Sequence, residues 1–198
     1  MIQTERWNRR ADRILLSLDK LTYATREQLQ IIEGLGGDRN ASRILRRMED
    51  DGHVLSIRME RKIYYLSKRG SERVGGHKTD LKRSQIEHSL MRNDLYIRLG
   101  QPKNWRKEVP IKFNGEDNYL IPDAMFNEGN SFYFVEVDYK QSMNVNIDKI
   151  KRYSRLFKAL YREYKSHPTL IWRIHSAAKE RRLSDQCRNN KIKYRIYY

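Results

Sequence analysis

Acidic and basic side chains in the second half of the chain have spacings suited to phosphate chemistry. Asp123 follows a proline, and further along Glu136, Asp138 and Lys140 occupy alternate positions. Alternate side chains of a strand lie on one face, so these three should share a side, with Asp123 beside them on a paired strand. Converging carboxylates repel unless a proton or cation relieves them, and Mg²⁺ or Mn²⁺ prefers such oxygen ligands. The pattern predicts a metal site at Asp123, Glu136 and Asp138, and a catalytic set made of these three and Lys140.

The elements that must position these residues follow the order αβββαβαβ. We expect a helix at 81–99, strands at 106–113, 119–126 and 131–139, a helix at 146–164, a strand at 169–174, a helix at 177–188 and a strand at 191–197. Gly-containing turns at 115–118 and 128–130 join the first three strands as hairpins. Asp123 then lies within the second strand, and Glu108 of the first strand is a further candidate ligand.

The first 75 residues have a different pattern, with three helices followed by a β-hairpin. Apolar spacing predicts a helix over 5–18, and Thr25 with Gln28 forms a capping box that opens a second helix. Asp38 is expected to cap a third helix that ends near residue 51. Strands follow at 53–58 and 62–66. This order is typical of a winged helix-turn-helix.

The third helix and the hairpin carry the residues expected to bind DNA. The second helix of a helix-turn-helix enters the major groove, where Arg pairs with guanine and Asn with adenine, while a basic wing contacts phosphates. A solvated arginine face is the alternative interpretation. The predicted DNA-binding residues are Arg39, Asn40, Ser42, Arg43, Arg46, Arg47, Arg58, Arg61 and Lys62.

Composition agrees with a nucleic-acid partner. The 198 residues include 41 Lys and Arg against 25 Asp and Glu, a formal net charge of +16. The net charge is +5 over 1–75, +1 over 76–130 and +10 over 131–198. No signal peptide or transmembrane stretch is expected, and the single Cys187 excludes an intrachain disulfide, so we expect a cytoplasmic protein.

The glycine-rich stretch between the two patterns predicts an inter-domain linker. The expected domains are a winged helix-turn-helix at 1–75, a linker at 76–80 and a second domain at 81–198. Pro122-Asp123 followed by Glu136-Val137-Asp138 resembles the PD-(D/E)xK phosphodiesterase motif, and the element order resembles that restriction-endonuclease-like αβββαβ fold. The chain is therefore expected to be an α+β or α/β protein.

One departure from that motif matters for chemistry. Asp138 stands where the motif has lysine, which leaves the lysine role to Lys140 or to Lys149 on the following helix. Lysine migration of this kind occurs in the superfamily, and so does loss of activity.

The whole chain also resembles the replication-relaxation family of Gram-positive plasmid and mobile-element proteins. The resemblance rests on separated blocks at 21–29, 38–45, 64–70, 88–94, 121–123, 136–138 and 149–153. It implies a role in plasmid replication and in relaxation of plasmid DNA, with double-stranded DNA and other replication proteins as partners. It also implies association with the nucleoid or a plasmid. His88 and Asn93 belong to the pattern, and we favour helix packing at the domain interface over a site role for them.

Three functions remain open from the sequence. The first is a Mg²⁺- or Mn²⁺-dependent DNA endonuclease or nickase, targeted by the winged helix. The second is a non-catalytic replication initiator or transcriptional regulator that keeps a degenerate nuclease domain. The third, a relaxase with a tyrosine nucleophile, is disfavoured because the five histidines include no His-x-His pair. The oligomeric state, including a homodimer, and the DNA sequence recognised are left open.

Overall fold

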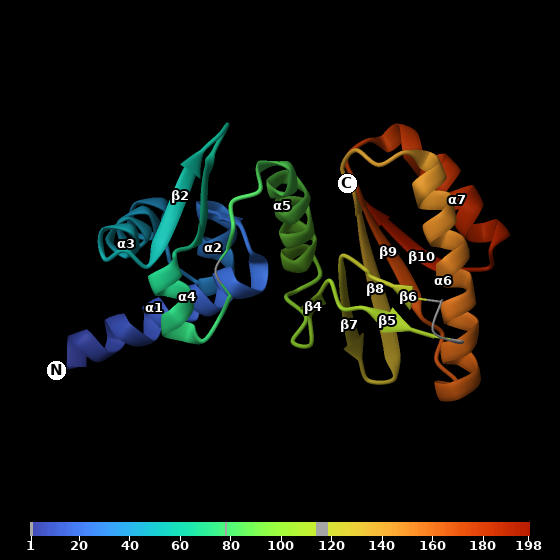
Figure 1. Cartoon of the computed structure of the whole chain (residues 1–198), viewed down its shortest axis with the longest axis horizontal. Helices are drawn as coiled ribbons and strands as arrows, with labels where there is room; N and C mark the ends of the chain where they lie inside the picture. Colours follow the sequence, from blue (N-terminus) through green and yellow to red (C-terminus); the bar gives the residue numbers. More distant parts are fainter. Residues whose placement is uncertain (1, 78, 114–118) are drawn as a thin grey trace. The chain divides into compact units, whose positions relative to one another are not determined.

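The computed structural model describes residues 2–77, 79–113 and 119–198, which form a mixture of helices and β-sheets (Figure 1). The chain divides into two compact units, Met1–Arg98 and Leu99–Tyr198. The sequence predicts a boundary at residues 76–80, so the structure assigns one more helix to the first unit than expected. The predicted turn at 115–118 lies outside the described residues.

The first unit consists of helices around a small antiparallel sheet. Its elements are α1 (Ile2–Leu21), β1 (Ala24–Thr25), α2 (Arg26–Glu33), α3 (Asp38–Asp50), β2 (Val54–Arg58), β3 (Lys62–Leu66), α4 (Lys68–Val74) and α5 (Arg83–Arg98). The strand order is β1-β3-β2. The predicted helices and the hairpin are confirmed, whereas β1 and α4 were not expected.

Buried polar contacts explain why α5 belongs to the first unit. The Gln28 side-chain amide donates to the Leu90 carbonyl oxygen at 2.9 Å and to Asp94 Oδ1 at 2.6 Å. Asn93 is fully buried, and its amide donates to the carbonyl oxygen of Tyr23 at 2.6 Å. Since a buried amide without partners is costly, these bonds fix α5 against α2 and the end of α1.

The predicted capping box at the start of α2 is confirmed. Thr25 Oγ1 accepts from the Gln28 backbone N–H, and Gln28 Oε1 accepts from the Thr25 N–H, both at 3.2 Å. Gly34 ends the helix in the left-handed conformation, with φ of 60°, which glycine adopts without strain.

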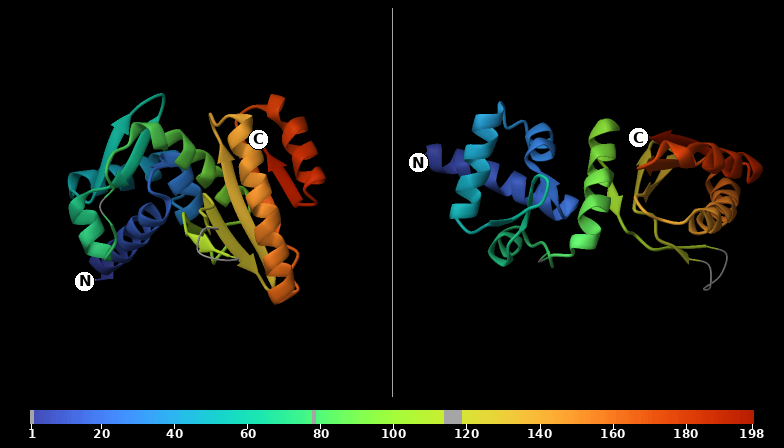
Figure 2. Two further views of the ribbon diagram at one scale, coloured as in Figure 1. Left: turned by 45° about the vertical axis from the view of Figure 1, so that its right-hand side comes forward. Right: turned by 90° about the horizontal axis from the view of Figure 1, so that it is seen from above.

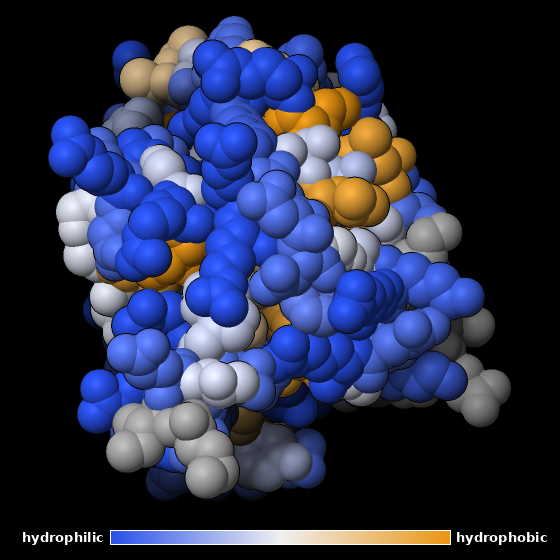
Figure 3. Space-filling model, turned by 90° about the vertical axis from the view of Figure 1, so that its left-hand side faces the viewer, coloured by the Kyte–Doolittle hydropathy of each residue, from blue (hydrophilic) through white to orange (hydrophobic). Residues whose placement is uncertain are grey.

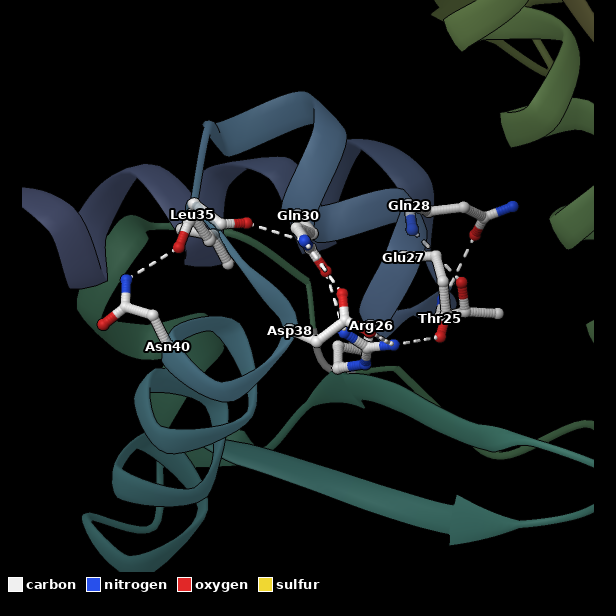
Figure 4. A network of polar contacts seen from close by, with 9 residues as sticks. Thr25, Arg26, Glu27, Gln28, Gln30, Leu35, Asp38 and Asn40 are labelled. Carbon is white, nitrogen blue, oxygen red and sulfur yellow. Dashed lines mark hydrogen bonds and ion pairs between the residues drawn. The ribbon is translucent and has the colours of Figure 1, made fainter.

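A polar network fixes the turn between α2 and α3 (Figure 4). Arg26 Nη1 lies 2.8 Å from Asp38 Oδ1, and the Gln30 amide donates to the same oxygen at 3.2 Å. The Asn40 amide donates to the Leu35 carbonyl oxygen at 2.7 Å. The prediction that Asp38 caps α3 is therefore wrong: Asp38 is the first helical residue, and its carboxylate faces α2 instead.

The second unit is a five-stranded sheet with helices on one face (Figures 1 and 2). Its elements are β4 (Arg106–Lys107), β5 (Ile111–Lys112), β6 (Tyr119–Leu120), β7 (Ala124–Glu128), β8 (Ser131–Asp138), α6 (Met143–Tyr164), β9 (Thr169–Ile174), η1 (Ala177–Lys179), α7 (Glu180–Asn189) and β10 (Lys193–Tyr197). The strand order of the five-stranded sheet is β10-β9-β8-β7-β4, with β8, β9 and β10 parallel and β7 antiparallel to β8. The strands β5 and β6 pair with each other in a separate antiparallel sheet.

The apolar core of this unit lies between the sheet and α6 and α7. Phe134 of β8 and Trp172 of β9 are buried against Tyr153 and Leu156 of α6 and Cys187 of α7. This packing places the α6-facing side of β8 in an environment without water.

Two predicted strands are shorter than expected. The stretch 106–113 contains only β4 and β5, and 119–126 contains only β6 and the start of β7. Pro110 and Pro122 lie in the gaps, and proline has no N–H to donate to a strand ladder. Glu108 is consequently exposed in a bend with φ of 52° instead of lying in a strand, and Asp123 lies in a bend immediately before β7. No described helix combines the length and apolar composition of a membrane span.

Candidate functional site

The carboxyl end of β8 presents two buried carboxylates to α6. Glu136 is 0% exposed and Asp138 is 1% exposed. Both contact side chains of α6, so they share the face of β8 that the alternation predicts. Burial of two acidic side chains side by side on a strand requires specific cationic or hydrogen-bonding partners, because an isolated ion is poorly solvated in a protein interior.

Two residues of α6 one turn apart bind Glu136. Lys149 Nζ lies 2.5 Å from Oε2, and the Tyr153 hydroxyl donates to Oε1 at 2.7 Å. Burial and the nearby Asp123 charge raise the pKa of Glu136 to about 8, although Lys149 and Tyr153 act in the opposite direction. Burial alone would lower the pKa of Lys149, but Glu136 and Asp123 outweigh it, so its pKa is raised and the ammonium stays charged.

Asp123 lies beside Glu136, as the sequence predicts. Its Oδ2 accepts a hydrogen bond from the Val137 backbone N–H at 2.6 Å, which ties the bend before β7 to β8. The Asp123 charge also raises the pKa of Glu136, so the two carboxylates repel each other. Asp123, the first acid of the motif, therefore lies beside Glu136, the second acid, in a bend and not in a regular strand.

Asp138 is bound by a different set of donors. Lys179 Nζ lies 2.9 Å from both carboxylate oxygens, and the Asn146 amide donates to Oδ2 at 2.7 Å. The Gln141 backbone N–H donates to Oδ1 at 3.1 Å, and Lys179 also donates to the Gln141 carbonyl oxygen at 2.6 Å. Asp138 thus holds together the loop after β8, the start of α6 and η1.

Lys140 does not continue the alternation of β8, because the strand ends at Asp138. Lys140 is exposed in the following bend, and its ammonium lies 4.9 Å from the centre of the Tyr139 ring. The lysine in contact with Glu136 is Lys149, which the sequence names as the alternative.

The carboxylates differ in their fitness to hold a metal ion. The described residues contain no group of three or more His, Cys, Asp or Glu side chains that could hold one. Both oxygens of Asp138 already accept from Lys179, and one also accepts from Asn146. Both oxygens of Glu136 are also occupied, by Lys149 and Tyr153. Asp123 and Glu136 are nevertheless the pair whose mutual repulsion a cation would relieve, and a Mg²⁺ ion bound to them would keep several water ligands and compete with Lys149 for Glu136.

The predicted DNA-binding residues of α3 lie on its exposed face. Arg39, Arg43 and Arg46 are exposed, while the opposite side of the helix is buried in the core of the first unit. Asn40 already uses both ends of its amide, donating to Leu35 and accepting from Arg43 at 2.8 Å. Asn40 therefore stabilises the turn before α3 and positions the Arg43 side chain.

Among the remaining predicted DNA-binding residues, the hairpin cations differ in their contacts. Arg58 is exposed near the tip, and Arg61 lies 3.8 Å from Glu87. Lys62 Nζ lies 2.7 Å from Glu49, which ties the hairpin to α3. Ser42 and Arg47 of α3 are exposed.

The structure adds residues that the sequence did not select. Tyr153 could have been found, since it follows Lys149 by one helical turn. Lys179 and Asn146 gave no such signal, because Lys179 is far from Asp138 along the chain and only the fold joins them. Asn93, by contrast, holds α5 to the first unit, in agreement with a packing role.

Two mixed units of helices and sheet, one with an arginine-rich helix face and the other with buried carboxylates, make up the protein. The family model of replication-relaxation proteins matches residues 15–170, and the chain belongs to this family. The family indicates a role in plasmid replication or relaxation, which links the chain to DNA and the replication machinery. No curated protein and no solved structure matches the chain.

Proposed function

We propose that the first unit binds duplex DNA as a winged helix-turn-helix. In this proposal α3 enters the major groove and the β2–β3 hairpin is the wing. Support comes from the turn network that joins α2 to α3 and from the division of α3 into a buried face and a face with Arg39, Arg43 and Arg46.

We further propose that the second unit cuts or nicks DNA at a PD-(D/E)xK-like site made of Asp123, Glu136 and Lys149. The observation that carries this proposal is the contact of Lys149 with a buried Glu136 beside Asp123. Two acids and a lysine at one point supply what phosphodiester hydrolysis needs, namely cation ligands and a positive charge for the phosphate.

Each residue has a separate task in this mechanism. Asp123 and Glu136 would hold Mg²⁺ or Mn²⁺, which when bound activates water and stabilises charge on the attacked phosphate. Lys149 orients a phosphate oxygen through its ammonium, and Tyr153 fixes the Glu136 carboxylate. Asp138 with Lys179 positions the loop after β8 and the start of α6, which carries Lys149.

A non-catalytic DNA-binding initiator or regulator is the second candidate. The observation that favours it is the existing neutralisation of the acids, since Lys149 pairs with Glu136 and Lys179 with Asp138. These lysines compensate the buried acids without any metal, so a nuclease-like fold that has lost its activity could retain them for folding alone.

A plasmid assay separates the two candidates. Supercoiled plasmid is incubated with the protein and Mg²⁺ or Mn²⁺, and open-circular and linear products are quantified. The nuclease proposal expects nicking that Asp123→Asn, Glu136→Gln and Lys149→Ala abolish. Lys140→Ala is the matched lysine control and should retain activity, because Lys140 is exposed beside Tyr139. No nicking by the wild type would leave the non-catalytic candidate, and nicking by Glu136→Gln equal to that of the wild type would refute the proposed site.

A separate measurement tests duplex binding. Fluorescence anisotropy of a labelled duplex at several salt concentrations gives the affinity and its salt dependence. Arg43→Ala with Arg47→Ala should weaken binding and flatten the salt dependence, because each phosphate contact contributes a slope of about 0.9. Unchanged affinity in this double variant would contradict the proposed role of α3.

A further inference from the structure

The first turns of α1 contribute nothing to the core of the first unit. Described side chains before Ala11 are exposed, apart from the half-buried Trp7. From Ala11 onward the helix buries one face, with Ile14, Leu15 and Leu18 at 0% exposure. Core packing therefore explains the apolar residues in the second half of α1, but it does not explain the arginine-rich composition of residues 3–10.

Arginines of this segment lie beside arginines of α3. Arg6 and Arg10 of α1, together with Arg43 and Arg47 of α3, line one hollow of about 330 Å³. None of the described residues that line it is acidic. The side of the molecule that carries α3 and the start of α1 is largely covered by hydrophilic side chains in Figure 3. Four guanidinium groups around one hollow repel each other, and an anion placed there would relieve that repulsion.

Contacts with neighbouring side chains restrict two of these arginines. The Arg47 guanidinium lies 3.9 Å from the centre of the Trp7 ring, and its Nε is 3.8 Å from Asp51 Oδ2. Arg43 donates to the side-chain oxygen of Asn40 at 2.8 Å. The Trp7 ring and the Asn40 amide restrict the two guanidinium groups through uncharged contacts, and the only acidic contact among these is that of Arg47 with the partly exposed Asp51. This arrangement prepares their planar donors for a phosphate.

The same helix provides a contrasting pair of arginines. Arg9 lies 3.3 Å from Glu5, and Arg13 lies 3.0 Å from Glu33, so both have carboxylate partners. Arg6 and Arg10 line a hollow on α1 together with this pair and Glu5, but of the four arginines only Arg6 and Arg10 also line the hollow shared with α3. The two pairs therefore differ in their access to α3 and in their carboxylate partners.

We infer that the hollow between the start of α1 and α3 binds the sugar-phosphate backbone of duplex DNA, with Arg6 and Arg10 as phosphate contacts. The inference rests on the proposed binding of duplex DNA by α3 and extends the surface to a second helix. The α1 contacts are independent of base sequence, because guanidinium groups recognise phosphate oxygens that every duplex presents. They add affinity and fix the position of α3 on the duplex.

Anisotropy measurements on the full chain test this with a charge-matched comparison. Arg6→Ala with Arg10→Ala is compared with Arg9→Ala with Arg13→Ala, which removes the same charge from the same helix. Loss of two phosphate contacts should lower the salt slope by about 1.8. The affinity ratio of wild type to variant should therefore be roughly 60-fold larger at about 0.1 M salt than at about 1 M salt. The loss should be equal for unrelated duplex sequences, and the control pair should lose markedly less. Circular dichroism should report unchanged folding of Arg6→Ala with Arg10→Ala.

The outcomes distinguish this inference from the proposed function. If Arg43→Ala with Arg47→Ala weakens binding while the two α1 pairs lose equal affinity, the α1 surface is refuted and the role of α3 stands. If the wild type binds no duplex, both are refuted. Loss of affinity for one duplex sequence alone would also overturn the inference.

Trp7 offers a second readout that does not depend on charge removal. Trp105 and Trp172 are 5% and 0% exposed, so acrylamide should quench mainly Trp7. Saturating duplex should protect this emission, and Trp7→Phe should remove the protected component. Undiminished quenching of the wild type at saturating duplex would contradict a backbone lying in the hollow.

Discussion

The two units of this protein use charge in opposite ways. In the first unit, arginines of α1 and α3 are exposed and several surround a hollow without acidic lining residues. In the second unit, Glu136 and Asp138 are buried, and each is paired with a lysine. Exposed charges contribute little to stability and remain available to a partner, whereas buried pairs are strongly coupled to the fold. Substitutions should therefore affect binding in one unit and stability in the other.

The largest effect is expected for Lys179→Ala. This change leaves the Asp138 carboxylate buried without its cation, which should cost about 3 kcal/mol, toward the lower end for a buried pair because Lys179 is 28% exposed. Urea unfolding followed by tryptophan emission measures the loss. Asp138→Asn in the same background should recover part of it, and Lys151→Ala on the surface of α6 is the control. A loss below 0.5 kcal/mol, on the scale of ordinary surface changes, would show that Asp138 reaches water.

A smaller effect is expected for Tyr153→Phe. The variant loses the hydroxyl that donates to Glu136 at 2.7 Å, and above about pH 8, where Glu136 is ionised, a hydrogen bond to a charged group contributes about 2 kcal/mol. Because that bond lowers the pKa of Glu136, its removal should raise this pKa further. Urea unfolding measures the stability change. Tyr161→Phe, on an exposed side chain of the same helix, should leave stability unchanged, and an equal loss in both would contradict the role of Glu136.

Thr25→Ala tests whether the first unit also depends on a buried polar contact. The change removes the N-cap of α2 and half of its capping box, which should cost about 1 kcal/mol. Thermal unfolding followed by circular dichroism measures it, with the exposed Ser42→Ala as the control. A neutral result would mean that packing of α2 alone positions the helix.

The smallest stability effect is expected for Arg39→Ala with Arg46→Ala. Both side chains are exposed on α3, so the free energy of unfolding should change by less than about 0.5 kcal/mol per substitution. Arg26→Ala, which removes the contact with Asp38, should cost more. A large loss for the α3 pair, measured by the same thermal scan, would break the contrast between the two units.

Local patterns predicted much of the fold. The bounds of β9, the capping box at Thr25, the β2–β3 hairpin and the turn before β8 follow from spacing and turn chemistry. The predictions were wrong where a single residue determines the local structure against the pattern of its neighbours. Pro110 and Pro122 interrupt stretches whose composition is typical of strands, and Asp38 bonds to Arg26 in place of capping α3.

The sequence predicted part of the candidate site, because strand pairing and alternation position some of its residues. Asp123 lies beside Glu136, and Glu136 and Asp138 share a face, as expected from pairing and alternation. Lys140 was preferred to Lys149 because it continues the strand pattern, but β8 ends before it. The metal ligands and the catalytic set stay predictions.

The sequence by itself determined the residue types, their spacing and the local elements, because helix periodicity, strand alternation and capping act over a few residues. Only the tertiary structure decided which cation meets which acid. Lys149 reaches Glu136 from α6, the helix that packs on β8 within the crossover to β9. Lys179 reaches Asp138 from η1 because β8 and β9 are parallel, so that their carboxyl ends lie at the same end of the sheet. It also decided that α5 packs with the first unit, through amide contacts such as that of Asn93 with Tyr23. Such pairings depend on long-range packing, which no local spacing encodes.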